Sequence, residues 1–174
     1  MTRKSSFAPV VAPGTRVLIL GSLPGERSLA ERRYYAHPRN QFWRLVGSVI
    51  GRNLEALEYE ARLAALLAAR IGLWDTVASA ARQGSLDAAI REAEHNPLAE
   101  LVATLPELRA VAFNGATSAR IGLAALAGSE LALLPLPSSS PAYAAMSFAE
   151  KRRLWAAIGE FLGQPLASSG PEPQ

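Results

Sequence analysis

The side chains that could carry chemistry come directly after short apolar runs of the sequence. They are Ser22, Asp75, Asn114 and the serines at 138–140. One of these serines could form a Ser–His–Asp catalytic triad with His37 and Asp75. The Gly-x-Ser-x-Gly turn that presents such a nucleophile is missing, however. The two opposed carboxylates of ordinary glycoside hydrolysis are missing too, because Asp75 is the only acidic residue in these segments.

Composition excludes several further classes of chemistry. The 174 residues contain no cysteine and only two histidines, His37 and His95. Disulfides, thiolate zinc sites, cysteine nucleophiles and cysteine-ligated iron–sulfur clusters are therefore excluded together. With so few imidazoles a multi-histidine metal site is not expected either. We expect no metal ion and no organic cofactor.

Two segments suggest contact with a phosphate or a nucleic acid. Residues 21–25 read Gly-Ser-Leu-Pro-Gly, which is neither a Walker loop nor a dinucleotide-binding fingerprint, and a simple tight turn remains the alternative. Residues 26–44 mix five arginines with four aromatic residues, and residues 151–153 add a second basic cluster, in a chain of net charge +3. Such a mixture suits a surface that binds phosphates and stacks bases, or else a solvated helix face with its apolar side in the core.

Strands that alternate with helices must position these residues. Continuous apolar runs predict buried strands at residues 17–20, 71–77, 110–113 and 131–136. Helical spacing predicts helices over 42–51, 54–70, 116–126 and 147–162, with Ser147 as a cap, and short helices within 86–104. This order favours a three-layer α/β/α fold around a parallel sheet, with the loops after its strands meeting in one crevice.

The ends of the chain look different from its middle. We expect a flexible N-terminus over residues 1–13, one domain over 14–163 and a disordered Pro/Ser/Gly tail over 164–174. The N-terminus lacks the apolar segment of a secretory signal, and the apolar runs are too short to span a bilayer. We therefore expect a monomer in the cytoplasm, associated with the nucleoid and not with a membrane.

Taken together, the segments resemble the uracil-DNA glycosylase superfamily, and most of all its hypoxanthine-DNA (deoxyinosine) glycosylase branch, followed by the mismatch-specific uracil glycosylases. The resemblance covers residues 17–162, and its most specific block is Tyr-Tyr-Ala-His-Pro-Arg-Asn-Gln-Phe-Trp at 34–43. Shorter matches follow in the same order, namely residues 21–25, 28–29, 72–75, 84–87, 113–115 and 136–142. The lack of cysteine separates the chain from the iron–sulfur branches of the superfamily.

The resemblance implies a central four-stranded parallel sheet and removal of a damaged base from DNA. The base must first be flipped out of the duplex and then held by stacking and edge hydrogen bonds. By resemblance, Tyr35 is the stacking platform, Asn114 reads the base, and Ser22 and Leu23 complete the base pocket. Alternatively, Tyr35 only covers the core, and Asn114 only forms a turn with Gly115.

Asn40 is the catalytic residue that the resemblance implies. Residues 22–23 stand where the most active members carry an aspartate, so no carboxylate is present there. An amide can orient a water by hydrogen bonds, although it cannot act as an effective base. Bracing the helix start is the alternative role of Asn40. We expect His37 to tie its loop together and assign it no proton transfer.

The remaining site residues are expected to contact the DNA backbone and minor groove. They are Pro24, Gly25, Ser138, Ser139, Ser140 and Pro141. The role of the loop at 136–142 is implied by its resemblance to the second motif of the superfamily, and a surface turn is the alternative. The resulting hypothesis is a monofunctional glycosylase for DNA containing deaminated bases, with hypoxanthine first and uracil second. A mismatch-specific uracil/thymine glycosylase and a catalytically silent binder of damaged or single-stranded DNA are the two alternatives.

Overall fold

Four short strands build the central sheet of the computed structural model, which describes residues 3–163. The strands are β2 (Val17–Gly21), β3 (Ile71–Asp75), β6 (Ala110–Asn114) and β7 (Ala132–Leu136). They pair in parallel in the order β3-β2-β6-β7. Every residue of β2, β3 and β6 is buried, as a continuous apolar run predicts for a sheet covered on both faces.

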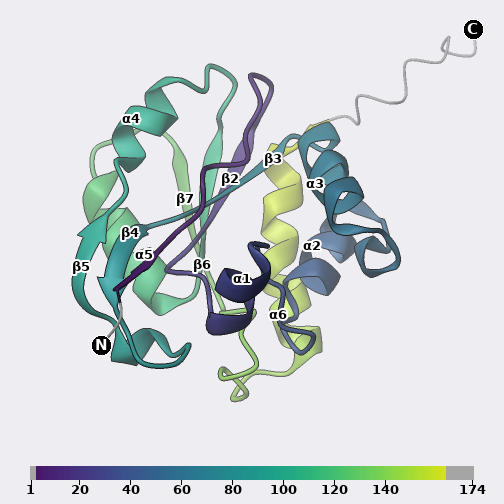
Figure 1. The fold of residues 1–174 in the computed structure, drawn as a ribbon. Helices are drawn as coiled ribbons and strands as arrows, with labels where there is room; N and C mark the ends of the chain where they lie inside the picture. Colours follow the sequence, from purple (N-terminus) through teal and green to yellow (C-terminus); the bar gives the residue numbers. More distant parts are fainter. Residues whose placement is uncertain (1–2, 164–174) are drawn as a thin grey trace, which may run out of the picture.

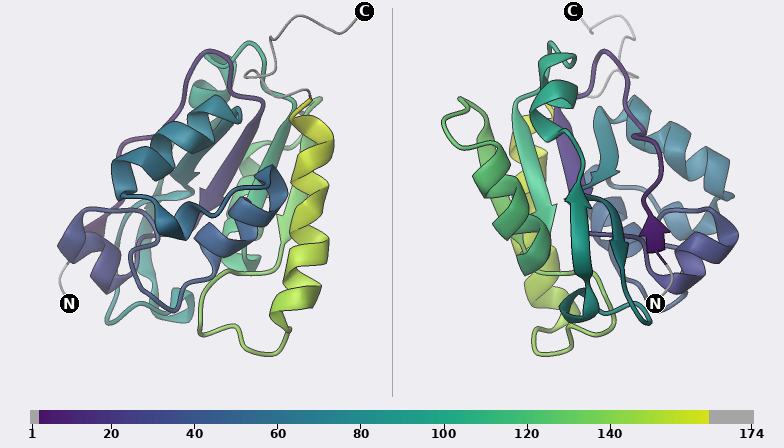
Figure 2. Two further views of the ribbon diagram at one scale, coloured as in Figure 1. Left: turned by 90° about the vertical axis from the view of Figure 1, so that its right-hand side faces the viewer. Right: turned by 60° about the vertical axis from the view of Figure 1, so that its left-hand side comes forward.

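Helices cover both faces of this sheet (Figures 1 and 2). On one face lie α2 (Phe42–Ile50), α3 (Tyr59–Ala68) and α6 (Phe148–Trp155), and on the other lie α4 (Leu98–Ala103) and α5 (Ala116–Ala125). Successive residues of β2 alternate between the two cores, because strand side chains point to opposite faces. The predicted three-layer α/β/α fold with a four-stranded parallel sheet is confirmed.

A second sheet was not expected from the sequence. It is antiparallel and contains β1 (Arg3–Ser5), β4 (Val77–Ala81) and β5 (Arg91–His95) in the order β1-β4-β5. The prediction of helices throughout 86–104 is wrong for β5, whose five residues are polar or small and all exposed, so no alternation marks the strand. The strand predicted over 71–77 ends at Asp75 as β3, and Val77 is the first residue of β4. The short helix η2 (Asp87–Ala89) links β4 to β5.

The N-terminal segment differs from the flexible terminus that we predicted. Arg3–Ser5 pairs with β4 along its length, and Val10 forms an isolated bridge with Leu73 of the central sheet. These backbone hydrogen bonds come from strands that follow much later in the chain, so the local sequence does not reveal them. The predicted tail at 164–174 lies outside the described residues.

Two helix predictions also need correction. The predicted helix over 54–70 is interrupted: η1 (Leu54–Ala56) is followed by an extended Leu57, and α3 begins only at Tyr59. The Arg62 side chain stabilises this break by donating to the Leu57 carbonyl at 2.9 Å and to the Glu55 carbonyl at 3.1 Å.

The last helix begins as predicted, because Ser147 Oγ accepts from the Glu150 amide at 3.2 Å. It narrows to the 3₁₀ segment η3 (Ala156–Phe161) after α6. Trp155 and Ile158 are buried on the face toward the sheet, whereas Leu154 is 43% exposed. No helix in residues 3–163 is long and apolar enough to cross a lipid bilayer.

Candidate active site

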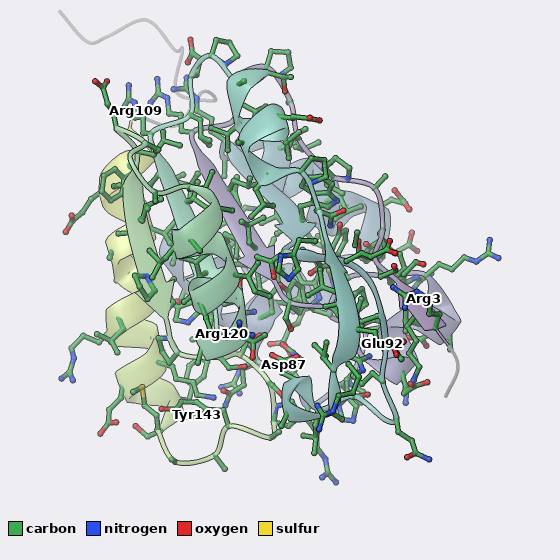
Figure 3. The ribbon with its side chains drawn as sticks, turned by 90° about the vertical axis from the view of Figure 1, so that its left-hand side faces the viewer. Arg3, Asp87, Glu92, Arg109, Arg120 and Tyr143 are labelled. Atoms are coloured by element: carbon green, nitrogen blue, oxygen red, sulfur yellow. The ribbon has the colours of Figure 1, made fainter. Side chains whose placement is uncertain are left out.

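A cavity of about 480 Å³ lies at the carboxyl ends of the parallel strands. It is lined by residues 21–28 after β2, by Asp75 of β3, by residues 114–117 after β6 and by residues 138–143 after β7. Residues 85–88, from the connection between β4 and β5, complete the wall. Asp87 and Tyr143 accordingly lie at the same end of the molecule in Figure 3, with Arg109 at the other end. The predicted convergence of the four strand-end loops is confirmed.

Three neighbouring strands provide the floor of the cavity. Asp75 of β3 pairs in register with Gly21 of β2, and Asn114 ends β6 on the other side of β2. Adjacent strands are about 4.8 Å apart, so the backbones of Asp75 and Asn114 are separated by about 10 Å. Between them Gly21 contributes no side chain, so the Asp75 carboxyl and the Tyr35 hydroxyl can lie close to its Cα.

Asn114 is buried, and its side-chain amide is held at both ends by Ser139. Its Nδ2 donates to Ser139 Oγ at 2.9 Å, and its Oδ1 accepts from the Ser139 amide at 2.8 Å. An amide group has two N–H donors and two acceptor lone pairs, so one donor and one acceptor site remain for a ligand. Asn114 can therefore present a fixed donor–acceptor pair to the edge of a base.

Tyr35 lines the cavity beside this amide. Its ring stacks on Phe42 with centroids 3.9 Å apart and planes inclined by 14°, and its carbonyl accepts from Trp43 Nε1 at 3.1 Å. Its φ of 54° lies in the left-handed region, which a non-glycine residue adopts only when its surroundings hold it there. The backing by Phe42 makes Tyr35 a rigid platform.

The other aromatic residues of the 34–43 block belong to the core. Tyr34, Phe42 and Trp43 are all less than 5% exposed and pack among the helices on one face of the sheet. The base-stacking surface predicted for residues 26–44 is thus reduced to Tyr35. Three of the four aromatic residues along this stretch are therefore core residues that support the fourth, Tyr35, although Tyr34 also touches the cavity.

Asn40 lines the cavity and also braces the start of α2. Its Oδ1 accepts from the Phe42 amide at 2.9 Å, and its own amide donates to the His37 carbonyl at 2.9 Å. The bracing role that the sequence left open is therefore present, and no hydrogen bond from Asn40 Nδ2 occurs among the described residues. His37 is exposed and accepts from the Arg39 amide through Nδ1 at 3.0 Å, so it ties this loop together as predicted.

The loop after β2 approaches the cavity through its backbone. Ser22 donates through Oγ to Asp87 Oδ1 at 2.5 Å, and the Leu23 side chain turns into a small apolar cluster with Val77, Ala80 and Ile121. The carbonyls of Leu23 and Pro24 both accept from the Arg82 guanidinium, which is buried. Gly25 lies against the Ser85 side chain. Ser85 Oγ accepts a hydrogen bond of 2.8 Å from the amide of Glu26, the first residue of α1 (Glu26–Glu31).

Two carboxyl groups face this region: Asp75 is buried, and Asp87 is half-buried. Burial and the nearby Asp87 charge raise the pKa of Asp75 to about 7, against a smaller opposing effect of Arg82. Burial also raises the pKa of Asp87, although the hydrogen bond from Ser22 and the Arg82 charge act against it. The sequence places Asp75 at the crevice but suggests no role for it, and no local signal marks Arg82 as a site residue.

The loop after β7 provides the outer wall. Ser139 is buried, and its amide, hydroxyl and carbonyl all bond within the protein, so its predicted contact with DNA would compete with Asn114. Ser138 and Ser140 are half-buried and Pro141 is exposed. Tyr143, which was not predicted, is 39% exposed at the rim.

The basic residues differ in their availability. Lys151 is buried and donates to Gln41 Oε1 at 3.0 Å and to the Tyr143 carbonyl at 2.8 Å, so it positions the wall of the cavity and is not a free surface charge. Arg27 and Arg44 pair with Glu31 and Glu55. Arg39 is exposed and forms no ion pair within residues 3–163.

Known proteins share this fold and sequence pattern. A model of the uracil DNA glycosylase superfamily matches residues 8–159. The chain is 45% identical over 116 residues to a hypoxanthine DNA glycosylase of Methanosarcina barkeri, covering 67% of this chain and 73% of that protein. It is also 45% identical over 112 residues to a hypoxanthine DNA glycosylase of Methanosarcina acetivorans, covering 64% and 71%.

A solved structure agrees with these relatives. The solution structure of a protein from Methanosarcina acetivorans, provisionally named a uracil DNA glycosylase, superposes with a TM-score of 0.84 at 38% identity, covering 94% of this chain and all of that one. An α/β/α fold with a cavity at the carboxyl edge of its sheet defines the class of protein. The chain belongs to the uracil DNA glycosylase superfamily.

Proposed function

We propose that this protein is a monofunctional DNA glycosylase that flips hypoxanthine out of DNA and hydrolyses its N-glycosidic bond. The observation that carries the proposal is the cavity in which a backed aromatic ring, Tyr35, adjoins a fixed amide, Asn114. Its volume of about 480 Å³ lies within the usual range for small-molecule pockets, about 300–1,000 Å³. The names of the two Methanosarcina relatives favour hypoxanthine over uracil.

The chemistry available in the cavity fits a dissociative hydrolysis. The loop after β2 offers Ser22 and Leu23 and no carboxylate, so strong general-base activation of water does not come from this loop. Asn40 can orient the water through Nδ2 while its Oδ1 holds the start of α2. Asn114 and the loop backbone can hold the departing base, on which negative charge develops.

The absence of an amine nucleophile supports monofunctional chemistry. A glycosylase that also cleaves the strand through a Schiff base needs an amine at the reacting carbon. The chain has two lysines, Lys4 and Lys151, and neither lines the described cavity. Strand breaks should therefore appear only after alkali treatment of the abasic product.

We propose a DNA path across the cavity mouth, formed by Pro24, Gly25, Ser138, Ser140 and Pro141. These residues line the cavity from the loops after β2 and β7, on opposite sides of Asn114. Backbone and hydroxyl contacts there can bind phosphates without reading sequence. Action as a monomer and a location in the cytoplasm remain predictions.

The test is incubation of the purified protein with duplexes that each contain one hypoxanthine, uracil or xanthine, followed by alkali. We expect hypoxanthine to be released fastest. Release of uracil or thymine from mismatches in preference to hypoxanthine would support the mismatch-specific alternative. Specific binding without alkali-sensitive sites would support a catalytically silent binder of damaged or single-stranded DNA.

A further inference from the structure

The β3 end of the cavity floor holds two buried polar atoms that have no hydrogen-bond partner within residues 3–163. They are Asp75 Oδ2 and Tyr35 Oη. The Asp75 residue as a whole is 3% exposed and lines the cavity. The Tyr35 hydroxyl approaches the Asn114 amide without forming a hydrogen bond of ordinary geometry. Because proteins rarely bury polar groups without partners, these atoms mark a place where a ligand can supply them.

Both side chains converge on the middle of the floor, over Gly21. A Cβ atom on Gly21 would lie 2.6 Å from Asp75 Oδ1 and 3.0 Å from Tyr35 Oη. The space above Gly21 is therefore bordered by a carboxyl group, a hydroxyl group and, on the β6 side, the Asn114 amide. Only the carboxyl group of these three readily gives up a proton near neutral pH.

The charged surroundings of Asp75 come from the second sheet and its loops. Asp87 of η2 raises the pKa of Asp75 and the guanidinium of Arg82 lowers it, but burial is the largest effect and the pKa reaches about 7. The Arg82 guanidinium donates hydrogen bonds to the carbonyls of Leu23, Pro24 and Gly84. Among the described residues it forms no ion pair with Asp75 or Asp87. The aromatic hydroxyls of Tyr34 and Tyr35 are the other titratable groups that influence Asp75 or are influenced by it.

We propose that Asp75 acts as the general acid of this glycosylase, as a protonated carboxyl that faces the flipped base and gives its proton to it. This inference rests on the proposed function. As the bond between C1′ and the base nitrogen breaks, its electron pair moves to the base, and the Asp75 proton moves to a ring nitrogen or carbonyl oxygen of the base. Water then adds to C1′ and releases one proton to solvent, from which the Asp75 carboxylate is reprotonated.

With Asp75 as the general acid, the other cavity residues orient groups and do not transfer protons. Asn40 and Asn114 are amides, so they can orient groups and donate hydrogen bonds but cannot transfer a proton in this range of pH. A neutral leaving base is a better leaving group than an anion, and a positioned acid typically contributes about 100- to 10,000-fold to the rate. Burial of Asp75 keeps the required proton bound near neutral pH, where an exposed aspartate would have lost it.

The test is the pH profile of single-turnover release of hypoxanthine, measured for the parent, Asp75→Asn and Glu100→Gln. Glu100 is an exposed acid on α4 outside the cavity and serves as the matched control. We expect the parent rate to fall above about pH 7, by about tenfold per pH unit, because the acid form is lost. Asp75→Asn should be about 100-fold slower at pH 6 and should lack that fall, while Glu100→Gln should follow the parent.

Asp87→Asn provides a second test in which Asp75 itself stays in place. Removing the Asp87 charge removes a cause of the raised pKa of Asp75, so the fall in rate should move to lower pH. The inference is overturned if Asp75→Asn keeps the parental rate and profile, or if Asp87→Asn leaves the position of the fall unchanged. A parent protein that releases none of the three deaminated bases at any pH would instead overturn the proposed function itself.

Discussion

The two ends of the cavity floor each bury a polar side chain, but they differ in whether that side chain has hydrogen-bond partners within the protein. At the β6 end, both sides of the Asn114 amide are paired with Ser139 before any ligand arrives. At the β3 end, Asp75 Oδ2 is buried and has no hydrogen-bond partner among residues 3–163, and the Asp75 pKa is raised to about 7. The β6 end is stable and prearranged, whereas the β3 end keeps unused hydrogen-bonding capacity at a cost in stability. Such a cost is typical of functional sites.

The largest expected effect concerns stability at the β3 end. With a folded pKa of about 7 and an ordinary value of 3.8 when unfolded, Asp75 binds its proton more tightly in the folded state. Its contribution to stability is present below about pH 4 and falls by about 1.4 kcal/mol per pH unit as the pH rises toward 7. Asp75→Asn should therefore be more stable than the parent at pH 8, by up to about 4 kcal/mol, and much less so at pH 4.

Urea unfolding of the parent, Asp75→Asn and Glu100→Gln at pH 4, 6 and 8 measures this effect. Glu100→Gln should show no such trend, because Glu100 is exposed. An Asp75→Asn variant that is equally or less stable at every pH would mean that the β3 end carries no electrostatic cost, and the contrast between the two ends would disappear.

The next effect concerns Asn40, which combines a cavity position with a structural one. Asn40→Ala should slow single-turnover release about 100-fold, which corresponds to about 2.7 kcal/mol in the barrier. Binding to DNA with a non-cleavable analogue should change by less than about tenfold. Asn40→Asp keeps the oxygen that accepts from Phe42 but replaces the amide donor, so it should keep the melting temperature of the parent and still be slow. A parental rate in both variants would exclude Asn40 from catalysis.

Breaking the β6 end should affect stability and recognition together. Asn114→Ala leaves the buried Ser139 amide and hydroxyl without their partner, which should cost about 1–3 kcal/mol in the free energy of unfolding. It should also weaken binding of a hypoxanthine analogue, since the contact exists before bond breaking. Ser139→Ala, which removes only the hydroxyl, should have a smaller effect on both. Chemical denaturation and analogue binding measure the two effects, and unchanged analogue binding in Asn114→Ala would contradict base reading.

The smallest effect belongs to the rim of the cavity. Arg39 lies between two residues that line the cavity and has no ion-pair partner among the described residues, so Arg39→Ala should weaken DNA binding by about tenfold or less. It should also lower the slope of log K against log salt by about one. Arg109→Ala at the opposite end of the sheet is the control (Figure 3). Equal losses in both variants would mean that the positive charge acts without a defined DNA path.

The amino-acid sequence by itself determined the central sheet and the place of the cavity. Apolar runs such as residues 17–20 can only be buried, and parallel strands bring the residues that follow them, Asp75 and Asn114 among them, to one edge. The specific block at 34–43 pointed to the family, because its residue types and order are unusual. These signals are local or follow from a general rule of topology, so they are readable without coordinates.

Only the tertiary structure decided what each side chain does. Tyr34 and Tyr35 are adjacent and of one type, and both touch the cavity. The Tyr34 side chain is in the core with its hydroxyl bonded to the Ala8 carbonyl, whereas the Tyr35 hydroxyl has no partner among the described residues. The polar strand β5 exists because β4 pairs with it, and that pairing brings Asp87 and Arg82 to Asp75. Burial, pairing and the pKa of a carboxyl group depend on neighbours that are distant in the chain, and no local pattern of residues encodes them.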